Sequence, residues 1–282
     1  MEKLTSILAV AASPDQVPLV LDKSVAVARC FGARVEVLVT DSETARAVGM
    51  HSAERDYDNV TFCCLHRGAD EWHEVLLRRI LTTHPDIVVK ISGSGLAPDR
   101  FSLDDSDWKL ANDSTAPVLL VRTAAWSDHL RFAAALDVSD EENSDLARSI
   151  LHTAGFLAMG TNSVLDILYS EREAHDEALR MERAVRLAQL VREFHVGCER
   201  IEMLSGEPGK RLPPLLASRR YDVLVLGGET RSTGFLGLGA GDGNVGTLVE
   251  ASESDVVLVR APETEAGFAR PTGSVVEQRP HH

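Results

Sequence analysis

The segment best suited to chemistry is rich in glycine and runs from Leu226 to Thr247. It lies between a predicted strand and a predicted helix that begins near Val245. Glycines let backbone N–H groups approach phosphate oxygens, and the start of a helix adds partial positive charge. The segment therefore predicts an anion-binding loop, in which the Thr247 hydroxyl would donate to a phosphate or bind its metal ion. A glycine-rich loop that binds nothing is the alternative.

Two familiar phosphate-binding motifs do not fit this segment. Gly241 to Gly246 spells GxGxxG, but a dinucleotide fingerprint follows its strand directly, and Gly241 comes fifteen residues after Leu226. The stretch from Gly206 to Arg211 has the wrong glycine spacing for a P-loop. The sequence thus argues against a Rossmann dinucleotide site and against a Walker-type ATPase.

One aspartate, Asp137, ends an apolar run that begins at Phe132. In open α/β sheets, ligands bind at the carboxyl ends of the strands, beside the switch in strand order. From that place the Asp137 carboxylate would accept a hydrogen bond from a ribose hydroxyl. The residue type fits equally well an N-cap or turn aspartate before a helix that starts near Asp140.

The histidines and cysteines give a weaker signal. Cys64, His66 and His73 lie close together in the sequence, but their spacing matches no compact zinc motif. His175 and His195 are flanked by Glu and Arg on a predicted helix, which is typical of a solvated face. We expect neither a metal site nor a catalytic histidine from these residues.

Apolar runs recur in the same order in the two halves of the chain, which indicates an internal repeat. The matching runs are Ser6–Ser13 with Phe132–Ser139, Val35–Thr40 with Val164–Tyr169, Asp86–Lys90 with Asp222–Leu226, and Pro117–Arg122 with Asp255–Arg260. They are nearly continuous, as in strands buried on both faces, and helical periods lie between them. Each half therefore reads as alternating strands and helices, and the parallel strands need crossover helices.

The repeat predicts two tandem doubly wound α/β domains, each with a five-stranded, mostly parallel sheet flanked by helices. We place them at residues 1–124 and 127–262. The short, partly polar stretch Thr123–His129 predicts a tight joint rather than a free tether. Residues 263–282 mix Gly, Pro and charge without apolar periodicity, so we expect a disordered tail.

Composition narrows the classes of function. The 282 residues carry a formal net charge of −14, which would repel a nucleic-acid backbone. No stretch reaches the ~20 apolar residues of a membrane-spanning helix, and no secretory leader is seen. We therefore expect a cytoplasmic protein with no nucleic-acid partner and no membrane insertion.

Taken together, these features resemble the universal stress protein family, in particular its tandem-domain E-type members. The residues that carry the resemblance are Asp137 after strand one, the second strand Val164–Tyr169, Gly206–Pro208 after the third strand, Asp222–Gly227, Gly246–Thr247, Ser254–Arg260, and the first-half ending Asp107–Arg122 followed by Trp126. The resemblance covers residues 1–262. It implies a stress-response protein that binds ATP or another adenine nucleotide.

The resemblance also implies roles for individual residues of the second half. Gly228, Gly246 and Thr247 would hold phosphates, Asp137 would lie near the ribose, and a backbone group of Ile167 would contact adenine. Gly227 and Gly234 belong to the same glycine segment.

Two features of the segment depart from the family pattern. Arg231 stands where the family has a second glycine, and about five extra residues precede Gly246. The guanidinium of Arg231 would either pair with phosphate or block the site. Because a triphosphate brings about four negative charges, we expect Mg²⁺ or Mn²⁺ to accompany it.

The first half differs at the corresponding places. Asp107 and Trp108 stand where the second half has Gly246 and Thr247, and Ala11 aligns with Asp137. We expect no nucleotide there and a structural or partner-docking role, with an unknown protein partner.

Other readings of the whole chain remain. It could be a scaffold or signalling module without nucleotide, or a binder of a hydrophobic small molecule. Enzymatic activity would be slow ATP hydrolysis at most. The final strands of the two halves would pair within one chain, which favours a monomer but leaves a dimer open.

Overall fold

Strands and helices alternate throughout the part of the chain that the computed structural model describes, namely residues 3–64, 72–92, 103–138, 144–171, 176–194, 197–228 and 244–261. The strands are β1 (Ser6–Ala11), β2 (Arg34–Val39), β3 (Val60–Cys64), β4 (Ile87–Ile91), β5 (Val118–Val121), β6 (Arg131–Ala135), β7 (Val164–Glu171), β8 (Arg200–Ser205), β9 (Val223–Gly227) and β10 (Asp255–Val259). The helices are α1 (Val17–Phe31), α2 (Ser42–Arg55), α3 (Trp72–Thr83), α4 (Asp105–Asp113), α5 (Ser144–Gly160), α6 (Glu177–Glu193), α7 (Pro208–Arg219) and α8 (Asn244–Ala251), with a short 3-10 helix η1 (Pro14–Gln16) before α1. The predicted alternation is confirmed.

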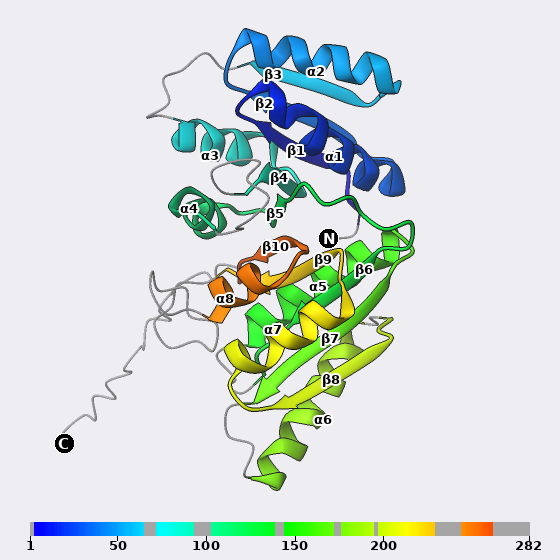
Figure 1. Cartoon of the computed structure of the whole chain (residues 1–282), viewed down its shortest axis with the longest axis vertical. Coiled ribbons are helices and arrows are strands. Elements are labelled where there is room, and N and C mark those ends of the chain that lie inside the picture. Colours follow the sequence, from blue (N-terminus) through cyan, green and yellow to red (C-terminus); the bar gives the residue numbers. More distant parts are fainter. Residues whose placement is uncertain are drawn as a thin grey trace, which may run out of the picture.

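All ten strands belong to one sheet, in the order β3-β2-β1-β4-β5-β10-β9-β6-β7-β8. Strands β1 to β5 form the first half and β6 to β10 the second, and neighbours within each half run parallel. In contrast, β5 and β10 pair antiparallel, with Leu119 opposite Val257. Figure 1 shows the first half, from blue to teal, above the second half, from green to orange. The final strands thus meet at the centre of the sheet, as the sequence predicts.

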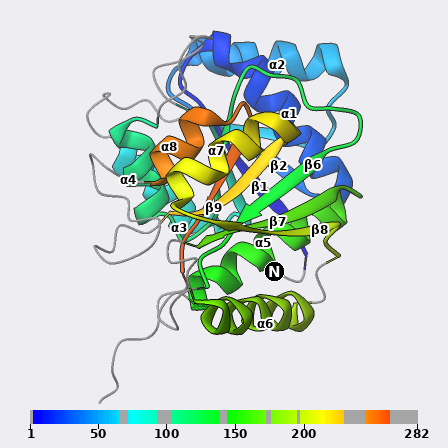
Figure 2. The same ribbon diagram turned by 60° about the horizontal axis from the view of Figure 1, so that its bottom comes forward.

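Helices cover both faces of the sheet. One cluster of buried apolar side chains includes residues of α1, α2, α5 and α6, and the other includes residues of α3, α4, α7 and α8. Figure 2 shows α5 and α6 on one side of the second half and α7 and α8 on the other. Alternate residues of each strand enter the two clusters, for example Ile7 in one and Leu8 in the other. Burial on both faces explains the nearly continuous apolar runs.

Two aspartates hold the starts of the two halves in the same way. Asp86 precedes β4, and its Oδ2 accepts from the backbone N–H of Thr5 at 2.7 Å. Asp222 precedes β9, and its carboxylate accepts from the backbone N–H groups of Ser127 at 2.8 Å and Arg131 at 2.9 Å. Ser127 belongs to the segment Thr123–His129, which connects the halves and is called the connecting segment below. The contact with Asp222 holds this segment in place, in agreement with the tight joint expected there.

A buried ion pair joins the halves where β5 ends. Lys23 on α1 and Asp255 at the start of β10 are 6% and 2% exposed, and Lys23 Nζ lies 2.6 Å from Asp255 Oδ2. The same carboxylate accepts from the Arg122 backbone N–H at 2.8 Å and from Trp126 Nε1 at 2.7 Å. Lys23 also donates to the Arg122 carbonyl oxygen at 2.8 Å. The pair therefore ties α1, the end of β5, the connecting segment and β10 together.

Burial dominates the electrostatics of this pair. It raises the pKa of the Asp255 carboxyl and lowers the pKa of the Lys23 amine, although their mutual attraction acts in the opposite sense on both. A buried ion pair adds little net stability compared with a well-packed apolar pair, whereas removal of one partner leaves an uncompensated charge. We infer that the pair fixes how the halves join.

We predict that Lys23→Met lowers the free energy of unfolding by about 3 to 5 kcal/mol at neutral pH, because Asp255 loses its buried cation. Urea denaturation of the two proteins measures the difference. Lys210→Met is the matched control, since the Lys210 side chain is 80% exposed and an exposed ion pair contributes about 1 kcal/mol or less. Equal losses in the two variants would contradict a special role for Lys23.

The same variant has a predicted pH dependence. Without Lys23, the folded-state pKa of Asp255 rises further above its unfolded value, so the folded protein binds the proton more tightly than the unfolded chain. The stability deficit of the variant relative to wild type should therefore shrink as the pH falls from neutral towards the ordinary carboxyl pKa. A deficit that is constant with pH would indicate lost packing instead.

Candidate functional site

In the second half, the strand order reverses between β6 and β9, which is where open α/β sheets form a ligand-binding crevice. Strands β6 and β9 are neighbours, but β6 leads through α5 to β7 on one side, whereas β9 leads through α8 to β10 on the other. Asp137, which is 9% exposed, follows the end of β6, and Gly228 follows β9 directly. The structure therefore brings these two predicted site residues to the carboxyl edge where such folds bind ligands.

Packing and strand pairing account for Gly227 and Gly228 at the end of β9, without reference to a ligand. A Cβ at Gly227 would lie 2.7 Å from a side-chain carbon of Leu146, so α5 packs directly against this backbone. The N–H of Gly228 donates to the Val259 carbonyl oxygen at 2.7 Å and extends the pairing of β9 with β10. The backbone amide of Gly228 is therefore engaged within the sheet.

The start of α8 belongs to the same edge of the second half. The helix begins at Asn244, close to the predicted start, and Gly246 lies in its first turn with Thr247 next to it. Among the described residues, no atom lies within 4 Å of a Cβ built at Gly246. The first turn of a helix leaves backbone N–H groups without intrahelical partners, and these suit an anion. The predicted site residues Arg231 and Gly234 lie outside the described residues.

Ile167 lies away from the edge. It is in register with Ala134 of β6, three residues before Asp137, and its side chain is fully buried. Ser170, three residues further along β7, is also buried, and its hydroxyl donates to the Gly206 carbonyl oxygen at 2.8 Å. The register puts Ser170 level with Asp137, so a ligand at this edge would meet the backbone near Ser170 before that of Ile167.

The corresponding edge of the first half holds an ion pair whose carboxylate is buried. Asp107, in the first turn of α4, is fully buried and pairs with Lys90 of β4. The Ser92 hydroxyl donates to the other oxygen of this carboxylate at 3.0 Å. The strand registers place Leu226 and Val245 at the equivalent positions of the second half. One half thus has charged groups under its first helical turn where the other has apolar side chains.

The same registers shift two comparisons made from the sequence by one residue. Asp137 corresponds to Ala12 rather than to Ala11. Both are alanines, so the first half has no carboxylate at this position. Gly246 corresponds to Trp108, and not to Asp107, because the helix-end bonds from Ser114 to Leu110 and from Ser252 to Leu248 match. The strand ladders fix which positions correspond, whereas similarity of short apolar runs leaves an uncertainty of one residue.

We predict that Lys90→Leu lowers the free energy of unfolding by about 3 kcal/mol, because the Asp107 carboxylate then stays buried without its cation. Addition of Asp107→Val, which copies Leu226 and Val245, should restore at least about 1 kcal/mol. Urea denaturation of both variants measures this coupling. A double variant that is less stable than Lys90→Leu alone would contradict the equivalence of the two positions.

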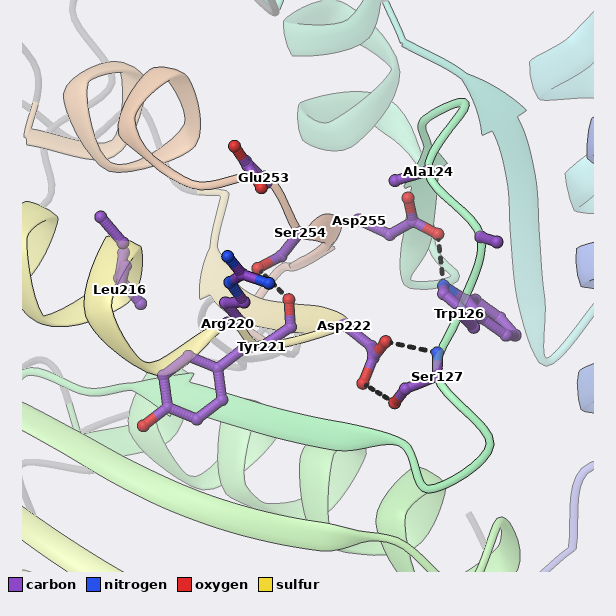
Figure 3. A pocket seen from close by; sticks show the side chains of 12 residues that line it. Ala124, Trp126, Ser127, Leu216, Arg220, Tyr221, Asp222, Glu253, Ser254 and Asp255 are labelled. Carbon is purple, nitrogen blue, oxygen red and sulfur yellow. Dashed lines mark hydrogen bonds between the residues drawn. The ribbon is translucent and has the colours of Figure 1, made fainter.

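A pocket of about 450 Å³ lies at the opposite, amino edge of the second half (Figure 3). The connecting segment, the end of α7 and the residues before β9 and β10 line it. Asp222, Glu253 and Asp255 bring carboxylates and Arg220 a guanidinium. Figure 3 shows Asp222 and Asp255 bonded to the connecting segment. Because acidic groups predominate in its charged lining, this pocket suits a phosphate poorly.

Solved structures with the same architecture identify the fold. A putative universal stress protein from Pseudomonas aeruginosa UCBPP-PA14 is 18% identical and superposes with a TM-score of 0.74 over 91% of this chain and 93% of its own. A functionally unknown protein from Pseudomonas aeruginosa PAO1 is 19% identical, with a TM-score of 0.73 over 92% and 93%. The chain has the universal stress protein fold.

A universal stress protein from Archaeoglobus fulgidus DSM 4304 agrees, with 15% identity and a TM-score of 0.62 over 93% of this chain and 98% of its own. No protein-family model and no curated protein matches the sequence. The resemblance noted in the sequence is thus confirmed for the fold.

In the described part of this universal stress protein fold, no three histidine, cysteine, aspartate or glutamate side chains gather as a metal site requires. His73 Nε2 lies 3.0 Å from an oxygen of Asp113, whereas His66, His175 and His195 lie outside the described residues. No helix among the described residues is long and apolar enough to cross a membrane.

The sequence did not reveal the residues that join the two halves of the fold. Lys23 stands beside the buried positions Leu21 and Val25 of α1, and Asp255 opens a strand. A lysine next to an apolar helix stripe is the one signal for the buried pair. It gives no clue to the partner, which lies in the other half of the chain.

Proposed function

We propose that the chain is a universal stress protein that binds ATP or another adenine nucleotide at the carboxyl edge of its second half. The observation that carries the proposal is the contrast between the two halves. In the first half, Lys90, Asp107 and Ser92 fill the place under the first turn of α4. In the second half that place is apolar, and no atom of the described residues adjoins the Cβ position of Gly246.

The groups at this edge fit the parts of a nucleotide. The backbone N–H groups at the start of α8, near Gly246 and Thr247, suit phosphate oxygens. The Asp137 carboxylate suits a ribose hydroxyl, and the backbone of β7 near Ser170 suits the base. Arg231 of the glycine segment would pair with a phosphate through its guanidinium. Mg²⁺ or Mn²⁺ would offset the charge that a triphosphate adds to a chain of net charge −14.

We propose residues 1–124 and 127–262 as the two domains. The first would be a structural or partner-docking copy, and the protein would act in the cytoplasm during stress. Binding without efficient hydrolysis fits the site, because tight binding by itself supplies no preference for a transition state.

We predict that the full-length protein binds Mg²⁺·ATP saturably and that Gly246→Asp abolishes the binding, because a carboxylate would replace open space beside the phosphates. A titration followed by isothermal calorimetry measures both proteins. An unsaturable signal with wild type would instead support a scaffold or a hydrophobic-ligand binder.

Gly49→Asp is the matched control. Gly49 also lies in a helix, a Cβ there also meets no atom within 4 Å, and the change in charge is the same. It should bind ATP as wild type does. If both variants lose binding equally, the general charge of the protein and not the start of α8 is responsible, and the proposed site is wrong.

A further inference from the structure

The antiparallel pairing of β5 with β10 relates the two halves by an approximate two-fold axis. The facing pairs are Val118 with Leu258, Leu119 with Val257, and Leu120 with Val256. Exchange of the halves turns the two outer pairs into each other and the central pair into itself. Each residue at the junction therefore has a counterpart in the other half, which we call its twin.

The buried ion pair and its twin positions differ in what fills them. On one side Lys23 reaches Asp255 and the carbonyl oxygen of Arg122. The twins of these three residues are Thr153, Pro117 and Arg260. The strand ladders identify Pro117 and Arg260 as twins of Asp255 and Arg122. Thr153 is the twin of Lys23 because α1 and α5 end with matching backbone bonds, from Ala33 to Ala28 and from Ser163 to Ala158.

The twin side is hollow. A pocket of about 330 Å³ lies there, between the turn after α4, one side of α5 and the end of β10. Thr153 is shorter than its twin Lys23, and Pro117 has no carboxylate, unlike its twin Asp255. On this side, therefore, neither an ammonium nor a carboxylate group fills the space that the ion pair occupies on the other side. Thr153, Pro117 and Arg260 all line the pocket.

The charges around the two places also differ. On the ion-pair side Glu253 and Asp255 bring carboxylates. Their twins are Thr115 and Pro117, which line the pocket together with His152. The described lining of the pocket contains Ser, Thr, His and Arg side chains, and no acidic residue belongs to it. In a chain with a net charge of −14, such a lining is suited to an anion.

We propose that this pocket binds a small organic oxyanion through a carboxylate or phosphate group. That group would lie beside Pro117, at the position that the Asp255 carboxylate has on the ion-pair side. Arg260 is held beside it, since its Nη1 donates to the Asn112 carbonyl oxygen at 2.9 Å at the end of α4. The hydroxyls of Thr115 and Thr153 supply donors. Burial lowers the pKa of His152, so its imidazole, which also lines the pocket, is neutral near pH 7. The volume is at the small end for ligand pockets.

The double variant Thr153→Lys/Pro117→Asp tests the proposal, because it rebuilds the ion pair in the pocket. The full-length protein is titrated with inorganic phosphate and with succinate, against chloride at matched ionic strength, and ring signals of its histidines are followed by NMR. His152→Asn identifies the His152 signal. We expect saturable shifts of this signal in wild type and binding at least about tenfold weaker in the double variant.

The two probes separate the sources of the anion: saturation with phosphate indicates a phosphate group, and saturation with succinate indicates a carboxylate. Thr153→Val, which keeps shape and fold but removes the hydroxyl, should weaken the better probe, whereas Arg220→Ala at the other pocket should not. Saturation by neither probe overturns the proposal. Equal binding by wild type and a folded double variant also overturns it, because the anion would then lie elsewhere.

Discussion

The antiparallel ladder between β5 and β10 is the interaction on which the rest of this structure depends. Each half ends in a strand whose outer edge would be exposed if the half stood alone, and exposed edges invite pairing with other chains. The ladder covers both edges at once and makes one sheet of ten strands. Because the pairing is antiparallel, the carboxyl edges of the two halves face opposite ends of the sheet. The same contact that unites the halves therefore separates their two candidate edges.

Within this common frame, the two halves differ mainly in a few polar residues. Asp86 and Asp222 perform the same task in each half. By contrast, the ion pair of Lys90 with Asp107 has no charged equivalent in the second half, and the pair of Lys23 with Asp255 has none on its twin side. Buried charges occupy space and demand partners. The first difference exchanges charged groups for buried apolar side chains, and the second exchanges an ion pair for a pocket.

Much of the fold could be predicted because a strand that is buried on both faces is apolar at nearly every position and is therefore visible in the sequence as an apolar run. The repeat, the alternation of strands and helices, and the start of α8 near Val245 followed from these runs. The carboxyl edge that gathers Asp137 and Gly228 followed from the general rule for such sheets. These predictions depend on local sequence, which the structure preserves.

Other features depend on register or on distant contacts, which local sequence does not record. A strand pattern alone does not say that Ser170, rather than Ile167, lies level with Asp137, because that depends on how β7 pairs with β6. The engagement of the Gly228 amide by Val259 is likewise a contact between strands. The partner of Lys23 lies in the other half of the chain, so only the folded sheet reveals it.

One frame thus carries two different edges: the ion pair of Lys90 with Asp107 fills one, and we propose that the other binds a nucleotide. Amide hydrogen exchange of the full chain, with and without saturating Mg²⁺·ATP, distinguishes the two edges. We expect slower exchange at the start of α8, residues 244–251, and unchanged exchange in α4, residues 105–113. Protection of α4, or the same behaviour of both helices, would contradict this proposal.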